Sequence, residues 1–328
     1  MKKLLSAAMA LVMGLSMGAP VLAVGEVGGN KYPYSDETEI KIDKEIKLTN
    51  EGTVNPAETF KFTVGEGVVT GTGVSDVEAP AIGEFSISFD EGQVASFTNL
   101  ELPKFDHDGF DHVGVYTYEI SETAGNTAGM IYNTEDYKLR VTVLNNEDGG
   151  FKRVVTVVDG KDVKKDVIVN KFSAGSLVVN KEITGNFAQQ EDEFEVTVTL
   201  TPDTGKVLKE DPITVTGAVG ETATVTKNGD VVKVEFTVTG NSEVTIANVP
   251  YDVSYEVTED VEGTGYTSNI ISEDNGKIDN ASQEVKIVNK LDQEVATGVN
   301  LDNLPYILVL ALVGVGLISF TVRKRVRN

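Results

Sequence analysis

Between residues 38 and 292, the chain consists mainly of short segments in which apolar and polar residues alternate. Successive side chains of a β-strand point to opposite faces, so a period of two predicts strands with one buried face. The segment Asn228-Gly229 lies between two such runs and predicts a tight hairpin. Long helical periodicity is absent from this region. The sequence therefore predicts an all-β fold made of β-sandwiches.

The segments repeat once in the same order. IDKEI (42–46), YEISE (118–122) and VIVNK (167–171) match VNKEI (179–183), YEVTE (255–259) and KIVNK (286–290). A repeat of this length indicates two copies of one structural unit. We therefore predict two tandem immunoglobulin-like β-sandwich domains, at residues 38–172 and 173–292.

Each copy places three polar side chains on the face that the alternation predicts to be buried. They are Lys44, Glu122 and Asn170 in the first copy and Lys181, Glu259 and Asn289 in the second. A buried ammonium group is costly unless it is paired or neutral. A buried Lys–Glu pair completed by the asparagine would explain one such set, although desolvation often cancels the benefit of such a pair. Its recurrence at matching positions favours a chemical role.

Amide formation between the lysine and the asparagine, with loss of ammonia, fits these residue types. Burial lowers the pKa of a lysine, so its amine can be neutral and nucleophilic. Burial raises the pKa of a carboxyl group, so the glutamic acid can polarise the asparagine carbonyl and relay protons. Folding itself supplies the proximity that a single turnover needs.

The two ends of the chain carry targeting features. Residues 1–23 combine two lysines, an apolar run and a final alanine, as in a secretory signal, and residues 24–37 form an N-terminal extension. Residues 304–322 are 19 uncharged residues, long enough to span a bilayer, and the basic residues 323–328 should stay cytoplasmic. The sequence thus predicts an exported protein with a membrane-held precursor.

Composition excludes several classes of function. Residues 24–298 hold 22 basic and 50 acidic side chains, a net charge of −28, which argues against nucleic-acid binding. The chain has no cysteine, so it has neither disulfides nor a thiol nucleophile. The loop DHDGFDH (106–112) lacks the full calcium-loop pattern and is interpreted as a solvated acidic loop. We therefore expect no metal, no cofactor and no turnover catalysis.

These paired motifs resemble those of the backbone (major) pilins of Gram-positive, sortase-assembled pili, in the streptococcal-type pilin isopeptide-linkage domain family. The resemblance covers nearly the whole chain. It implies a bond between Lys44 and Asn170 assisted by Glu122. It also implies a bond between Lys181 and Asn289 assisted by Glu259.

Residues 293–328 resemble a sortase cell-wall sorting signal, with the motif EVATG at 294–298 before the apolar segment. Ala296 stands where the usual motifs have proline. The resemblance implies cleavage between Thr297 and Gly298 and transfer of Thr297 to a lysine of the next subunit. That lysine is expected shortly before the first-domain asparagine. Lys164 fits best, and the alternatives are Lys161 and Lys165.

Together these features predict the structural shaft subunit of a covalent surface pilus. Its expected partners are identical subunits, a pilin-type (class C) sortase, cell-wall peptidoglycan, and tip or minor pilins. One alternative is a wall-anchored adhesin or minor pilin that does not polymerise. Another is an ordinary single-pass anchor with a stalk. A wall-anchored enzyme is a third reading, but no catalytic constellation supports it.

The predicted bonds have a direct mass signature. Residues 24–298 should have an intact mass about 34 Da below the sequence mass, one ammonia of about 17 Da for each amide formed. Mass spectrometry of the secreted chain measures this difference. An unshifted mass would contradict both bonds.

Overall fold

The structure is a computed structural model that describes residues 36–146, 149–165, 167–270 and 274–294. Its regular elements in these ranges are strands, apart from the short 3-10 turn η1 (Val219–Glu221). The prediction of an all-β fold is confirmed. The predicted signal, the sorting motif from residue 295 and the apolar segment 304–322 lie outside the described residues. No helix in the described ranges is long and apolar enough to cross a membrane.

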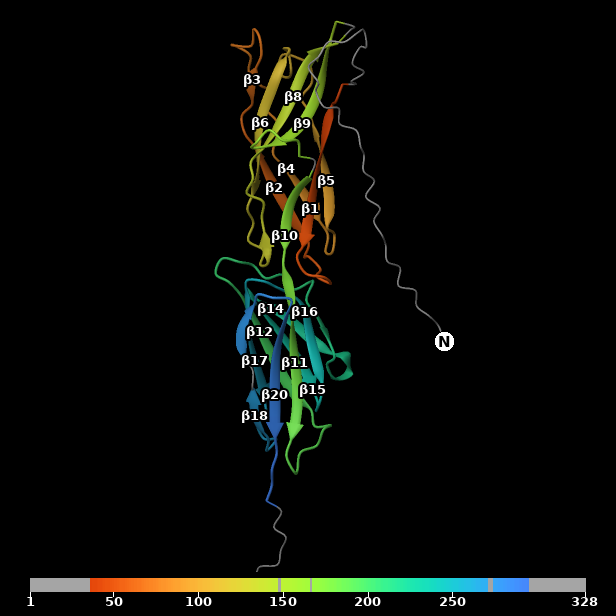
Figure 1. Ribbon diagram of the computed structural model, residues 1–328, viewed down its shortest axis with the longest axis vertical. Coiled ribbons are helices and arrows are strands. Elements are labelled where there is room, and N and C mark those ends of the chain that lie inside the picture. Colours follow the sequence, from red (N-terminus) through yellow and green to blue (C-terminus); the bar gives the residue numbers. More distant parts are fainter. Residues whose placement is uncertain (1–35, 147–148, 166, 271–273, 295–328) are drawn as a thin grey trace, which may run out of the picture. The chain divides into compact units, whose positions relative to one another are not determined.

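The first half of the described chain forms two sheets (Figure 1). One has the order β5-β1-β10-β7, and the other has the order β4-β2-β6-β8-β9, with β3 paired to β6. The strands are β1 (Glu39–Leu48), β2 (Glu58–Val64), β3 (Val68–Thr70), β4 (Phe85–Phe89), β5 (Ala95–Glu101), β6 (Gly114–Thr123), β7 (Met130–Ile131), β8 (Tyr137–Asn145), β9 (Phe151–Asp159) and β10 (Val167–Phe172).

The second half also forms two sheets, with the orders β13-β16-β11-β20-β18 and β14-β15-β12-β17-β19. The strands are β11 (Ala174–Thr184), β12 (Phe194–Pro202), β13 (Thr214–Thr216), β14 (Ala223–Asn228), β15 (Val231–Val238), β16 (Glu243–Pro250), β17 (Val253–Asp260), β18 (Thr267–Ile270), β19 (Asn275–Ile278) and β20 (Ser282–Lys290). The predicted hairpin at Asn228-Gly229 joins β14 to β15, and Gly229 has the positive φ of 64° that such a turn requires.

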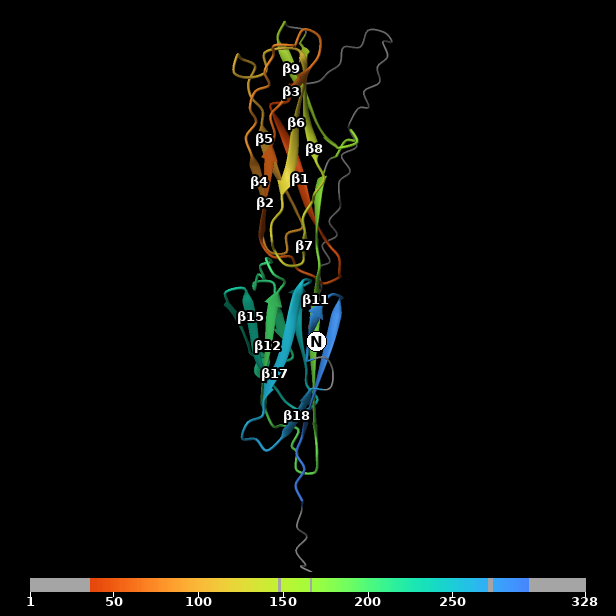
Figure 2. The same ribbon diagram turned by 90° about the vertical axis from the view of Figure 1, so that its left-hand side faces the viewer.

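Each half has its own apolar core between its two sheets. The strands show the expected alternation, as in β12, where Phe194, Val196 and Val198 are buried and the residues between them are more exposed. Figure 2 shows β12 and β17 on one side of the second half and β11 on the other. Burial of these inward faces is the main stabilising term for such a fold.

The first and last strands of each half lie side by side and run parallel. In the first half β1 pairs with β10, and in the second half β11 pairs with β20. Strand β10 ends at Phe172 and β11 begins at Ala174, so Ser173 alone separates them. The last strand of the first half thus continues almost directly into the first strand of the second.

Candidate functional site

Lys44 lies on the buried face of β1, where the alternation predicts it. Ile42 and Ile46, two residues away on either side, are also buried. The backbone register of β1 and β10 places Lys44 opposite Ile168, and Ile46 opposite Asn170. Because directly paired residues share a face, Lys44 and Asn170 are diagonal neighbours on the inner surface of one sheet.

Glu122 reaches the same point from the facing sheet. It lies near the end of β6, and the side chains of Lys44 and Glu122 are both 0% exposed. Lys44 Nζ donates to Glu122 Oε2 at 2.8 Å and to Asn170 Oδ1 at 2.7 Å. Asn170 Nδ2 donates to Glu122 Oε1 at 2.6 Å. The structure therefore brings the three predicted residues into one closed set of hydrogen bonds.

The contacts in this set differ in one respect from the sequence-based expectation. Glu122 contacts the amide nitrogen of Asn170, whereas the expectation placed it on the carbonyl oxygen. The oxygen instead accepts from Lys44 and from the backbone N–H of Asn133, at 2.9 Å. One carboxyl group thus bridges the nucleophile and the leaving group.

The second half brings its predicted residues to the same place in the fold. Lys181 on β11 lies opposite Ile287, and Ile183 lies opposite Asn289 on β20. This diagonal offset is identical to that of Lys44 and Asn170. Lys181 Nζ donates to Glu259 Oε1 at 2.5 Å from the facing strand β17, and the lysine and glutamate are 78 residues apart in both halves.

The two sets differ around the asparagine. Both side-chain polar atoms of Asn289 are buried and have no hydrogen-bond partner among the described residues. The second oxygen of Glu259 accepts a hydrogen bond from Ser268 Oγ at 2.6 Å. Ser268 lies directly across from Asn289 in the pairing of β18 with β20. The strand phase alone did not indicate this serine, because β18 is short and is half-exposed.

A phenylalanine ring covers each lysine. Lys44 Nζ lies 4.6 Å from the ring centroid of Phe60, and Lys181 Nζ lies 4.5 Å from that of Phe194. Phe60 and Phe194 occupy equivalent positions. Each lies on the strand beside the one that carries the glutamate, two residues before the residue that pairs with the glutamate. Neither phenylalanine lies in the three repeated motifs of the sequence, which is why the repeat did not indicate them as site residues. The rings exclude water and attract a cation at short range.

Burial lowers the pKa of both lysines. It lowers the pKa of Lys44 below 10.5, and the hydrogen bond and charge of Glu122 only partly oppose this effect. The pKa of Lys181 is lowered for the same reason, against the opposing effect of Glu259. A neutral amine in contact with a carboxamide is a competent nucleophile.

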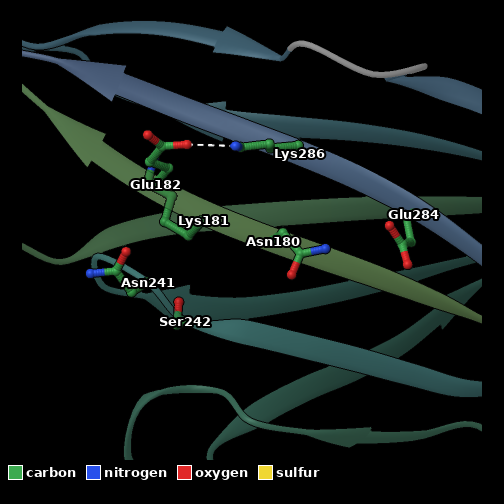
Figure 3. Close-up of a pocket in the computed structure, with 7 residues that line it drawn as sticks. All are labelled: Asn180, Lys181, Glu182, Asn241, Ser242, Glu284 and Lys286. Atoms are coloured by element: carbon green, nitrogen blue, oxygen red, sulfur yellow. Dashed lines mark ion pairs between the residues drawn. The ribbon is translucent and has the colours of Figure 1, made fainter.

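The outer face beside Lys181 carries ordinary surface charges. Glu182 pairs with Lys286 of the adjacent strand at 2.5 Å, and both side chains are partly exposed (Figure 3). These residues line an open pocket together with Asn180, Asn241, Ser242 and Glu284. Strand alternation thus separates an exposed ion pair from the buried pair of Lys181 and Glu259, although the residues are adjacent in sequence.

Comparisons with known proteins show which families and structures the chain is similar to. A family model described as "Spy0128-like isopeptide containing domain" matches residues 40–173. Another, described as "Domain of unknown function (DUF7601)", matches residues 175–291. The chain is 26% identical over 313 residues to a curated protein named "Pilin" from Streptococcus pyogenes serotype M1, with 87% of this chain and 90% of that protein covered. These matches support a streptococcal-type pilin.

Solved structures share the fold of this pilin. The major pilin protein (T3.2) from Streptococcus pyogenes serotype GAS13637 is 24% identical with a TM-score of 0.52, covering 79% of this chain and 99% of that one. Another major pilin from Streptococcus pyogenes is 20% identical with a TM-score of 0.51, covering 79% and 100%. Pilins are surface proteins, so an extracellular location is supported.

The candidate acceptor lysines lie between β9 and β10. Lys161 and Lys164 are exposed, whereas Lys165 is half-buried and lies 3.5 Å from Asp159. The backbone of Lys164 forms an isolated bridge with Val158. The other expected sortase residues, Thr297 and Gly298, lie outside the described residues.

The acidic loop at 106–112 contains two histidine–aspartate pairs, His107 with Asp108 and His112 with Asp111, each at 2.8 Å. These side chains are exposed. In the described ranges, no group of three or more His, Asp or Glu side chains is placed to hold a metal ion.

Removing either glutamate should leave one bond of this pilin unformed, because the proton relay between the two nitrogens is lost. Glu122→Ala and Glu259→Ala should each raise the intact mass, relative to a fully crosslinked chain of the same sequence, by about 17 Da. Glu119→Ala and Glu256→Ala are matched controls, since these glutamates lie on the same two strands and are exposed. A full mass deficit in Glu122→Ala and Glu259→Ala would show that the glutamates are dispensable.

The lowered pKa of Lys44 predicts a pH dependence in a chain that cannot react. In Asn170→Ala, Lys44 remains an amine whose pKa in the folded chain is below 10.5. In the unfolded chain the lysine has its ordinary pKa of about 10.5. At pH values between the folded and the unfolded pKa, the unfolded chain binds more protons than the folded chain. The free energy of unfolding should therefore rise with pH and level off above the unfolded pKa. Urea denaturation between about pH 7 and pH 11 measures this rise. The double variant Lys44→Met/Asn170→Ala should lack it, and equal slopes would contradict the prediction.

Proposed function

We propose that this pilin is the shaft subunit of a covalently polymerised surface pilus, with one autocatalytic Lys–Asn isopeptide bond in each of two tandem immunoglobulin-like domains, at 38–172 and 173–292. The observation that carries the proposal is that both halves hold a buried Lys–Glu contact with an asparagine on the inner diagonal from the lysine. The same register joins the first and last strands each time. A chance buried ion pair has no reason to recur with that offset.

The reaction follows from the contacts around Lys44. Nζ lies 2.7 Å from Oδ1 of Asn170, and a C=O bond is about 1.2 Å long, so Nζ lies at most about 3.9 Å from Cγ. When Lys44 is neutral and Glu122 carries its proton on Oε1, the oxygen beside Nδ2, the Nζ lone pair can attack Cγ. This proximity replaces an encounter between separate molecules.

The proton balance is closed by Glu122 alone. As the Nζ–Cγ bond forms, Nζ gives one proton to Oε2. Oε1 gives one proton to Nδ2, the Cγ–Nδ2 bond breaks, and ammonia leaves. Glu122 ends as it began, protonated, and the products are a neutral secondary amide and ammonia. Glu259 would serve Lys181 and Asn289 in the same way once its second oxygen, which accepts from Ser268 in this structure, met Asn289 Nδ2. We propose no other catalytic activity and no cofactor.

The bonds would stabilise the subunit and carry tension. Each closes a loop of more than a hundred residues, which in the chain-entropy model contributes roughly 5 kcal/mol. Tension entering at β1 would pass through the bond to β10 and on into β11. It would then cross the second bond to β20, so the remaining strands would bear little of it.

We propose that subunits are joined by a pilin-type (class C) sortase. It would cleave between Thr297 and Gly298 and transfer Thr297 to Lys164 of the next subunit, with Lys161 and Lys165 as alternatives. A secretory signal at 1–23 and the apolar segment 304–322 would deliver and hold the precursor until transfer. The finished polymer would then be attached to cell-wall peptidoglycan.

Polymerisation predicts a ladder of high-molecular-weight bands in cell-wall extracts on a denaturing gel. Lys164→Arg keeps the charge and should abolish the ladder, because a guanidinium group is a poor nucleophile. Lys161→Arg and Lys165→Arg are the matched controls, and loss of the ladder in one of them would reassign the acceptor. A single band from the unsubstituted chain would instead favour a wall-anchored adhesin or minor pilin that does not polymerise.

A further inference from the structure

The carbonyl oxygen of Asn170 has a second donor besides the attacking lysine. The backbone N–H of Asn133 points at Oδ1 with an N···O distance of 2.9 Å. A backbone N–H can only donate, so this contact fixes which end of the carboxamide is oxygen. It therefore also fixes Nδ2, the leaving group, against Glu122.

The side chain of Asn133 holds this N–H in place. Asn133 lies in the connection between β7 and β8, and its Oδ1 accepts from the backbone N–H of Glu135 at 2.8 Å. Such a contact is a local turn device of asparagine. Its Nδ2 donates to the hydroxyl of Tyr137 at 3.0 Å and to the carbonyl of Val169 at 3.2 Å. Val169 directly precedes Asn170, so the turn is tied to the strand that carries the reactive residue.

The position of this N–H matters because of where charge develops. Attack of Lys44 Nζ on Cγ converts the planar carboxamide into a tetrahedral species and places negative charge on Oδ1. A donor that already points at this atom stabilises the charge without reorganisation. The hydrogen bond from Lys44 Nζ to Oδ1 cannot supply this stabilisation, because Nζ is the atom that forms the new bond to Cγ.

We propose that the backbone N–H of Asn133 is the oxyanion donor for the Lys44–Asn170 bond, and that the Asn133 side chain is the positioning group for that N–H. This inference rests on the proposed isopeptide chemistry. It adds a group that the motif of lysine, glutamate and asparagine does not contain.

The test compares the two bonds within the same molecules. The complete chain is made by cell-free translation, quenched at intervals and digested, and mass spectrometry quantifies the two crosslinked peptides separately. Formation of the Lys181–Asn289 bond then serves as an internal clock. Three variants are compared with the unsubstituted chain: Asn133→Pro, which lacks the N–H; Asn133→Ala, which keeps the N–H but loses the turn contacts; and the exposed neighbour Thr134→Ala as the matched control.

Relative to the internal clock, Asn133→Pro should slow the first bond on the order of 100-fold, the usual effect of removing one oxyanion donor. Asn133→Ala should give a smaller slowing, of about tenfold, because the N–H remains but is less well held. Thr134→Ala should leave the rate unchanged. A first-bond rate in Asn133→Pro within about threefold of the unsubstituted chain would overturn the proposal.

Two measurements separate this role from a merely structural one. The first measurement compares the melting temperature of the double variant Asn133→Pro/Glu122→Gln with that of Glu122→Gln alone. Both variants lack the proton relay of Glu122, so the comparison shows whether Asn133→Pro by itself prevents the first half from folding. If the first half does not fold in Asn133→Pro, the first-bond rate of Asn133→Ala becomes the test, and an unchanged rate in that variant overturns the proposal. The pH profile of the first-bond rate in Asn133→Ala should keep its midpoint, because the N–H does not titrate. A midpoint shifted upward would mean that Lys44 had lost its burial, and would also overturn it.

The outcome for the unsubstituted chain distinguishes this inference from the proposed function. If neither crosslinked peptide forms, the isopeptide chemistry is wrong and the inference fails with it. If both form, and Asn133→Pro and Asn133→Ala form the first as fast as the unsubstituted chain, only the inference fails.

Discussion

The parallel pairing of the first strand with the last is the constraint on which the candidate site depends. Parallel neighbours cannot be joined by a tight turn, so all the other strands of each half are folded between them. The register then places a lysine and an asparagine on one inner diagonal, as with Lys44 and Asn170. The facing sheet supplies the glutamate, and the strand beside the glutamate supplies the aromatic ring. A slip of this register by one residue would put the two reactive side chains on opposite faces of the sheet.

Burial has opposite consequences before and after amide formation. Before it, desolvation of Lys44 opposes folding, and Glu122 offsets only part of the cost. The same desolvation favours the neutral, nucleophilic form of the amine. After amide formation the lysine carries no charge, and the secondary amide needs only hydrogen-bond partners. The cost of burying the lysine is therefore confined to the unreacted chain.

Much of this arrangement could be predicted from the sequence, because strand phase and the internal repeat are both local patterns. They were sufficient to identify Lys44, Glu122, Asn170 and their counterparts as inward-facing residues. The contact of Asn133 with Asn170 could not be predicted, because it depends on the path of a connection outside the strands. The hydroxyl of Ser268 was missed for a related reason, since a half-exposed edge strand has no clear phase. The orientation of the Asn170 carboxamide could be assigned only from the atomic contacts of its oxygen and nitrogen.

The single residue between β10 and β11 determines how the crosslinked subunit would respond to proteases. With both bonds formed, the chain from Lys44 to Asn170 is a closed ring, and so is the chain from Lys181 to Asn289. One cut inside either ring leaves its ends joined. The only unduplicated covalent path between the rings is 171–180, and all of it except Ser173 lies in strands. Proteases prefer exposed loops, so the surface connections can be nicked once in each ring without parting the subunit.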